Sequence, residues 1–194
     1  SDLEPTASTA AAAEALGIPV RREFFGENYA KQLAAEGKAA DLLLGNNVYA
    51  HVPDINDFTA GLRTALKPDG IITLEFPHLL NLIRENQFDT VYHEHYSYLS
   101  LHTVNHIFAQ QGLRIWDVEK LPTHGGSLRV YGCHAAHTRA TLPAVAELLA
   151  EEKEAGLLSL PIYQHFQAQA NQVKDNLVTF LIEQKKAGKK VAAY

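Results

Sequence analysis

The stretch from Phe88 to His95 contains the densest group of proton-transferring side chains in the sequence. It reads Phe-Asp-Thr-Val-Tyr-His-Glu-His, so Tyr92, His93, Glu94 and His95 follow one another directly. An imidazole titrates near neutral pH, a carboxylate can fix its tautomer, and a phenol can donate a hydrogen bond to a developing oxyanion. The sequence therefore predicts a site that removes a proton from carbon or oxygen.

Two other interpretations of this stretch stay open. If the chain is extended there, His93 and His95 share one face and could bind a metal ion. His51 or His78 would complete such a site, with Glu94 as a base, and the protein would be a histidine-metal hydrolase or isomerase. No His-Glu-x-x-His pattern supports a metal site, so we expect none. In the third interpretation these are polar loop residues that bond to the backbone.

The composition limits the classes of function. The 194-residue chain has a formal net charge of -5, which argues against a nucleic-acid partner because phosphate binding needs a basic face. Its single cysteine, Cys133, excludes an internal disulfide and a thiolate-rich zinc site. No apolar run approaches the roughly 20 residues that a membrane span requires, and no secretory signal precedes the first helix. We therefore expect a cytoplasmic protein without a membrane partner.

Apolar periodicity and turn residues predict alternating helices and strands. Helices are expected at residues 7–16, 28–36, 54–66, 100–111, 143–156 and 159–187, and strands at 20–25, 41–47, 71–77, 113–118 and 127–134. The first helix would have Ser8 or Thr9 as its N-cap and stop at Gly17. We expect strands 41–47 and 71–77 to be buried on both faces, and 127–134 to pair antiparallel at a sheet edge. Together these elements indicate a doubly wound α/β sheet.

The last predicted helix has an apolar seam. Its members repeat with spacings of three and four: Tyr163, Phe166, Ala170, Val173, Leu177 and Phe180. The interpretation we favour is that this helix packs on the core of the chain or links two domains. A homodimer seam, or a module kept for assembly without catalysis, is the alternative.

Four groups of residues follow predicted strands, where ligands bind in an open α/β sheet. They are Phe24-Phe25-Gly26, Asn46-Asn47 with His51, Glu75 to His78, and the loop that carries His95. Each group alone is explained by core packing or by turn chemistry. Their convergence at one edge of the sheet is the argument for a site.

Three blocks of sequence carry a resemblance to a known family. They are Leu44–Asp54, then Glu75–His78 together with Phe88–His95, and then Pro122–Arg129. On these blocks the chain resembles the S-adenosylmethionine-dependent sugar C-methyltransferases, which methylate a carbon of a nucleotide-linked deoxy-keto sugar. The resemblance implies a partial class I methyltransferase sheet, Rossmann-like, with flanking helices and a long C-terminal helix. Residues 1–138 would form the partial methyltransferase domain, and residues 139–194 the helical start of a C-terminal α/β domain.

The resemblance also implies roles for individual residues. Glu4 is implied to bind the cofactor as the acid that ends the second strand of the family's sheet. Phe24 and Phe25 are implied to lie beside the adenine, and Asn46 and Asn47 at the methionine end of the cofactor. The base that removes the proton next to the sugar ketone is implied to be His95, with Tyr92, Glu94 and His51 beside it. The resulting enolate would take the methyl group. Substrate-binding roles are expected for His78, His124 and Arg129, the last as a phosphate partner by its charge.

The chain also departs from the family pattern. Such enzymes begin with a cysteine-ligated zinc module and a Gly-rich loop after the first strand, and neither is found before Glu4. We therefore expect zinc only in an N-terminal module outside this sequence, and a chain that is the central piece of the enzyme and inactive alone. A gap in the sheet is expected between the strand near Phe25 and the one that ends at Asn46. An intact seven-stranded sheet would contradict this expectation.

Overall fold

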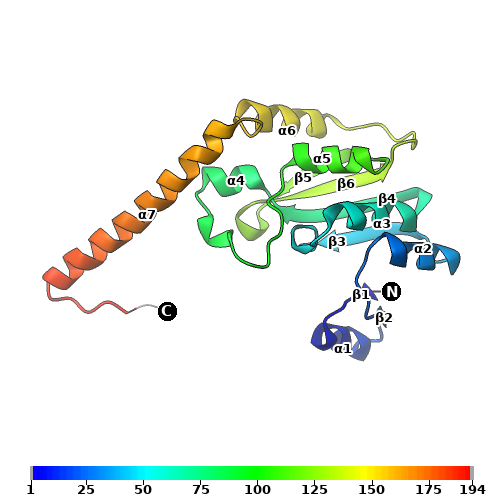
Figure 1. The fold of residues 1–194 in the computed structure, drawn as a ribbon, viewed down its shortest axis with the longest axis horizontal. Coiled ribbons are helices and arrows are strands. Elements are labelled where there is room, and N and C mark those ends of the chain that lie inside the picture. The colour runs from blue at the N-terminus through cyan, green and yellow to red at the C-terminus, as the bar shows by residue number, and fades with distance from the viewer. Residues whose placement is uncertain (1, 193–194) are drawn as a thin grey trace.

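The structure is a computed structural model, and it describes residues 2–192. Figure 1 shows the elements in chain order. The strands and helices are β1 (Asp2–Leu3), α1 (Ala7–Ala15), β2 (Val20–Arg21), α2 (Glu27–Ala35), β3 (Ala40–Asn46), α3 (Ile55–Ala65), β4 (Leu66–Pro77), α4 (Leu79–Arg84), α5 (Leu101–Gln110), β5 (Leu113–Leu121), β6 (Ser127–His134), α6 (Pro143–Glu154) and α7 (Leu160–Lys186). Short 3-10 turns lie at Tyr49–His51, Phe88–Thr90 and Thr123–Gly125.

The described strands form two separate sheets. The larger has the order β3-β4-β6-β5, and the smaller pairs β1 with β2 in parallel. β3 is parallel to β4, whereas β6 is antiparallel to both of its neighbours. The α/β fold and the gap between β2 and β3 are therefore as predicted. The predicted edge position of residues 127–134 is wrong, because β6 lies between β4 and β5, where Leu128 and Val130 are fully buried.

The strand predicted at residues 20–25 is shorter in the structure. It pairs only at Val20 and Arg21, and the last bond of the ladder runs from the Glu4 N–H to the Arg21 carbonyl. The next N–H of β1 that faces β2 belongs to Thr6, and it donates to the Glu4 carboxylate at 2.7 Å, so the ladder stops there. Because β2 loses its partner there, residues 22–25 leave the sheet and lead to α2.

The core lies on one face of the larger sheet. Ile72, Leu74 and Phe76 alternate along β4 and are all fully buried. They pack in one cluster with residues of α3, α5 and α6: Phe58, Leu62, Leu101, Val104, Phe108, Val145 and Leu148. Asp54 caps α3 and Ser100 caps α5 through their side-chain oxygens, which fixes where both helices begin.

The opposite face of β3 is exposed. Leu43 packs against the core, whereas Leu42 and Leu44 are 52% and 71% exposed. The prediction that this strand is buried on both faces is therefore wrong. A strand has period two, so Leu42 and Leu44 point to the face that the described helices leave uncovered.

Two predicted boundaries also change. The N-cap of α1 is Thr6 and not Ser8 or Thr9, while Gly17 follows the helix with a φ of +77° as expected of a stop residue. β4 begins at Leu66 and passes through the predicted turn. The register shifts there, because Ala40 pairs with Leu66 and Leu42 with Ile71, so residues 67–70 form a bulge.

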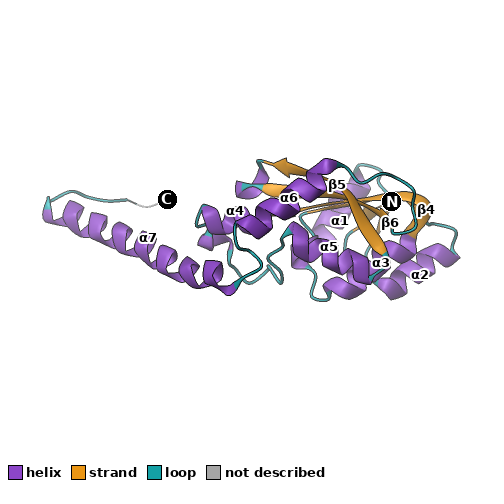
Figure 2. Ribbon diagram, turned by 90° about the horizontal axis from the view of Figure 1, so that it is seen from above, coloured by secondary structure: helices purple, strands orange, loops and turns teal. Residues whose placement is uncertain are grey.

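The long helix α7 projects away from the sheet (Figures 1 and 2). Only its first turns contact a core, where Ile162 and Phe166 pack against a small cluster around Leu80 and Leu157. No residue of α7 within the described range is buried, and Leu177 and Phe180 are more than half exposed. Beyond Phe166 the seam therefore does not pack on the core of the described residues, and the other half of that interpretation, a helix that links two domains, stays a prediction. No described helix is long and apolar enough to cross a membrane.

Candidate active site

The rings of His51, Tyr92 and His95 lie together at the carboxyl end of the larger sheet. The ring centroid of His95 is 4.7 Å from that of His51, 4.3 Å from that of Tyr92 and 5.9 Å from that of Tyr98. His51 ends the 3-10 turn after β3, and the other three side chains come from the loop after α4. The structure thus brings together three of the four side chains predicted to be catalytic.

Backbone carbonyls define the tautomers of the two histidines. Nδ1 of His95 is 2.9 Å from the carbonyl oxygen of Thr90, and Nδ1 of His51 is 3.0 Å from that of Glu94. A carbonyl only accepts, so in both rings Nδ1 carries the proton. In the neutral form Nε2 of each ring then has a free lone pair and can accept a proton.

The loop itself is held against the end of β3. The N–H groups of Tyr96 and Ser97 both donate to the carbonyl oxygen of Ala50, at 2.9 and 3.2 Å. This pairing explains why His51, next to Ala50, meets His95. Glu94 contributes its backbone carbonyl to the cluster, while its side chain is exposed. His93 is also exposed.

Asn47 and His124 form a second group beside this cluster. Nδ2 of Asn47 is 3.1 Å from Nε2 of His124, although the residues are 77 positions apart. Both adopt positive φ angles, +54° and +51°, which place their side chains across a sharp turn. Oδ1 of Asn47 is buried and has no hydrogen-bond partner within residues 2–192. A buried acceptor without a partner suits a ligand that brings an N–H or O–H group.

Glu75 is a buried acid at the end of β4, and within the candidate group Glu75 to His78 the sequence predicted no role for it individually. Its Oε1 accepts from the Thr123 hydroxyl and its Oε2 from Arg129, both at 2.8 Å. Its carbonyl accepts the N–H of Asn47 at 2.8 Å. Burial opposes ionisation, but the two hydrogen bonds and the Arg129 charge outweigh it and hold the Glu75 pKa below its ordinary value. An acid within an otherwise apolar strand was the signal available in the sequence.

The other predicted substrate residues have different surroundings. Arg129 is one-third exposed, and its charge is balanced by Glu75 at 2.8 Å and by Glu119 at 3.9 Å. His78 is only 1% exposed and contacts Glu152 of α6. In this structure His78 offers no surface to a substrate, because α6 covers it.

The predicted cofactor residues divide between the two sheets. Glu4 follows β1 in the small sheet, where its carboxylate accepts from the Thr6 N–H at 2.7 Å. Asn46 ends β3 in the large sheet and pairs with Glu75 in the register. Phe24 and Phe25 lie on the segment between the sheets, at a hollow of about 360 Å³.

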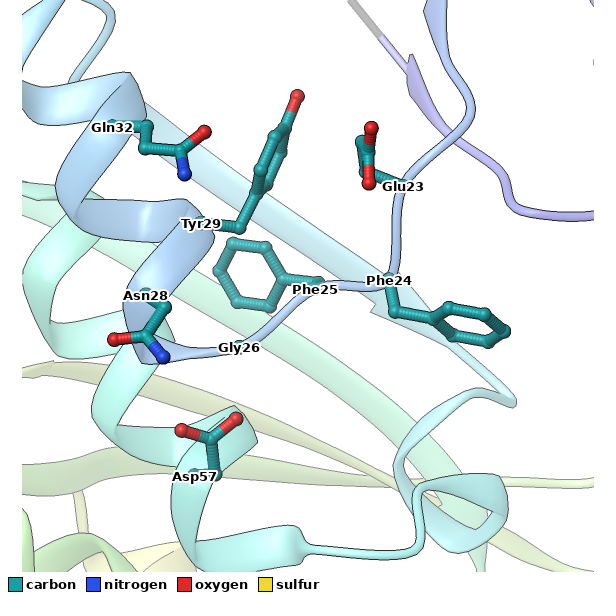
Figure 3. Close-up of a pocket in the computed structure, with 8 residues that line it drawn as sticks. All are labelled: Glu23, Phe24, Phe25, Gly26, Asn28, Tyr29, Gln32 and Asp57. Atoms are coloured by element: carbon teal, nitrogen blue, oxygen red, sulfur yellow. The ribbon is translucent and has the colours of Figure 1, made fainter.

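Figure 3 shows this hollow, which is lined by Glu23, Phe24, Phe25, Gly26, Asn28, Tyr29, Gln32 and Asp57. Phe25 points toward Tyr29, while Phe24 points away from them and is 83% exposed. Phe25 also packs edge-on against Phe58 of the core. A Cβ on Gly61 of α3 would lie 2.8 Å from the backbone carbonyl carbon of Gly26, so the close approach of this segment to α3 requires glycine at position 61.

The residues present fit S-adenosylmethionine at two of its three parts. Exposed aromatic rings with polar neighbours suit adenine, and the unpaired Oδ1 of Asn47 suits the ammonium group of the methionine end. Glu4 lies on the small sheet, apart from Asn46 and Asn47 of the large one. Within residues 2–192, no three His, Cys, Asp or Glu side chains gather closely enough to hold a metal ion.

Two known families and a curated relative match this chain. Residues 5–118 match the family described as a methyltransferase domain, and residues 122–194 match the C-methyltransferase C-terminal domain. The chain is 34% identical over 192 residues to C-methyltransferase NovU from Streptomyces niveus. That match covers 99% of the chain and 46% of the relative, so the chain spans about half the length of the curated relative it matches.

Solved structures share the fold at low sequence identity. The PH0226 protein from Pyrococcus horikoshii aligns with a TM-score of 0.52 at 14% identity, over 68% of this chain and 69% of that one. A possible histamine N-methyltransferase from Thermotoga maritima aligns with a TM-score of 0.51 at 16% identity, over 67% and 70%. The sequence matches and the shared fold lead to one conclusion: the chain belongs to the S-adenosylmethionine-dependent C-methyltransferase family.

Proposed function

We propose that this chain is the central part of an enzyme that transfers a methyl group from S-adenosylmethionine to a carbon of a nucleotide-linked deoxy-keto sugar through an enolate. The observation that supports it is the cluster of His51, Tyr92 and His95 with its fixed tautomers. The carbon next to a ketone needs a positioned base, and the enolate oxygen needs a hydrogen-bond donor.

His95 is the proposed base. Its Nδ1 donates to the Thr90 carbonyl, so Nε2 receives the proton from the substrate carbon, and the electron pair of the broken C–H bond moves into the enolate. The imidazolium that forms is stabilised by the same carbonyl, which keeps its hydrogen bond throughout.

Tyr92 is the proposed donor to the enolate oxygen. Its ring lies 4.3 Å from that of His95, and a phenol carries an O–H that can donate a hydrogen bond. Neutral His51 is less suited, because its N–H already donates to the Glu94 carbonyl and its Nε2 can only accept. We therefore assign His51 to proton acceptance beside His95, and Glu94 to holding His51 through its backbone.

The cofactor would be held by Glu4, Phe24, Phe25, Asn46 and Asn47. S-adenosylmethionine, when bound, supplies an electrophilic methyl group that needs no protein nucleophile. His124 and Arg129 lie on the turn and strand beside Asn47 and Glu75, where they would contact the nucleotide part of the substrate. Because Glu75 balances the charge of Arg129, this arginine would bind a phosphate as a hydrogen-bond donor more than as a free charge.

The test is methyl transfer by the full-length enzyme that contains this chain, incubated with S-adenosylmethionine and a panel of nucleotide-linked keto-sugars. We expect one sugar to gain the mass of one methyl group. His95→Asn keeps a donor near the Thr90 carbonyl but removes the base, so we expect kcat to fall about 100- to 10,000-fold. His93→Asn, at an exposed neighbouring position, is the matched control. Normal turnover by His95→Asn would contradict the assignment of the base.

A further inference from the structure

A buried histidine and a buried carboxylate form a contact that the proposed chemistry does not use. Nε2 of His78 lies 2.8 Å from Oε1 of Glu152, and the two side chains are 1% and 0% exposed. They are 74 positions apart, His78 at the start of α4 and Glu152 on α6. The carboxylate accepts, so Nε2 of His78 carries the proton.

The same carboxylate caps α5. Oε1 of Glu152 accepts the N–H of Leu101 at 2.6 Å, and Oε2 accepts that of His102 at 2.8 Å. These N–H groups have no partner inside the helix, and a helix N-terminus favours negative charge. Burying a carboxylate away from water is unfavourable unless it is paired and hydrogen-bonded, and three donors meet that need here. Glu152 of α6 therefore holds the start of α4 and the start of α5 through hydrogen bonds, which constrain the orientation of the helices as well as their separation.

His78 is also bonded through its backbone to both loops of the active site. Its N–H donates to the carbonyl of Gly126 at 3.0 Å, next to the turn that carries His124. It forms a bridge with Leu99, and the N–H of Leu79 donates to the Leu99 carbonyl at 2.9 Å. Leu99 ends the loop that carries His95. A shift of His78 would consequently move both loops.

We propose that Glu152 and His78 are positioning residues, which hold the loop of residues 91–99 where His95 meets His51 and can face the reacting carbon. This assignment replaces the predicted contact of His78 with substrate. It rests on the proposed function for its catalytic consequence. The positioning role concerns a geometry that exists without substrate. In it, the ring of His95 lies beside that of His51 and carries its proton on Nδ1.

The first test is the tautomer of His95, read from long-range ¹H–¹⁵N spectra of the protein. The signals of His95 are assigned by their loss in His95→Asn. In the wild type we expect the pattern of a ring protonated on Nδ1. In Glu152→Gln and in His78→Leu we expect averaged nitrogen shifts, because the loop no longer holds the ring against Thr90. His78→Gln places an amide N–H near the position of Nε2–H and should restore the wild-type pattern.

The matched control is Glu151→Gln, the same change one residue earlier on α6. Glu151 pairs with Arg84 at 2.7 Å, and its side chain is one-third exposed, so its loss should leave the His95 signals unchanged. In kinetic assays we expect Glu152→Gln and His78→Leu to lower kcat about 100-fold while KM for S-adenosylmethionine changes less than about threefold, since misplacement of about 1 Å costs such a factor.

Three outcomes would overturn the proposal. One is a folded Glu152→Gln protein with the wild-type His95 spectrum. Another is a His78→Gln protein that behaves as His78→Leu does. The third is loss of the whole fold in Glu152→Gln, by circular dichroism, because the pair would then hold the domain and not the loop. A full-length wild-type enzyme that transfers no methyl group would defeat the proposed function, and the spectra would still decide the positioning role.

Discussion

At the scale of single residues, a row of polar and charged side chains crosses the larger sheet on the face opposite the core. Asn46, Glu75, Arg129 and Glu119 are partners in the register of four neighbouring strands. Glu75 is buried and bonded on both oxygens, whereas Glu119 is half exposed. The two acids that flank Arg129 should therefore differ in their contribution to stability.

Glu75→Gln should lower the free energy of unfolding at neutral pH by about 1 to 3 kcal/mol, because Arg129 loses its ionic partner. The folded pKa of Glu75 lies below its ordinary value, so the folded chain keeps this carboxylate ionised when the unfolded chain binds a proton. Its contribution is complete above the unfolded pKa and is lost as pH falls through the folded pKa.

Urea unfolding from neutral to strongly acidic pH measures this effect. The difference between wild type and Glu75→Gln should shrink toward acid pH. Glu119→Gln is the control, and it should change the free energy of unfolding by less than about 1 kcal/mol, as expected of an exposed pair. A constant difference at all pH values would show that charge does not explain the role of Glu75.

At the scale of elements, α7 is a helix with a packed beginning and an exposed remainder. Phe166 is half-buried against the cluster around Leu80, whereas Phe180 on the same helix is 52% exposed. The sequence pattern gives both phenylalanines the same place in the seam. The difference between them arises only from where the neighbouring elements end.

The two phenylalanines allow a matched comparison in the 194-residue chain. Phe166→Ala should lower the free energy of unfolding by about 1 to 2 kcal/mol, less than for a fully buried ring. Phe180→Ala should leave it within about 0.5 kcal/mol of the wild type. Thermal and urea unfolding measure both. Equal losses in the two variants would indicate that the seam is covered in solution, as in the homodimer interpretation.

At the scale of the whole molecule, β3 is an edge strand with an exposed apolar face. Leu44 is 71% exposed on an edge that another strand can pair with. An uncovered apolar edge favours association of chains. Charged side chains are a common means of preventing such pairing.

Leu44→Lys should therefore reduce self-association of the chain without loss of stability. Leu43→Lys changes the neighbouring residue in the same way, but it would bury a charge against the core cluster and should destabilise the fold by several kcal/mol. Sedimentation measures association and urea unfolding measures stability. If Leu44→Lys unfolded as readily as Leu43→Lys, the exposed face assigned to β3 would be wrong.

The sequence by itself determined the local structure and the chemical types at the site. Helix periodicity and the stop at Gly17 each depend on neighbours a few residues away, so they could be predicted. The same holds for the prediction of a base and a phenol in the loop, because His95 and Tyr92 are three residues apart. The resemblance, carried by whole blocks, predicted the family.

Only the tertiary structure decided which distant residues meet and which are covered. His51 reaches the Glu94 carbonyl across 43 positions, and Asn47 reaches His124 across 77. His78 follows β4 and Arg129 lies on β6, yet α6 covers the first and Glu75 neutralises the second. Burial depends on the elements that pack above a residue, and a local pattern contains no information on them. For the same reason the apolar run around Leu42 and Leu44 predicted that both are buried, whereas they lie on a face that no described helix covers.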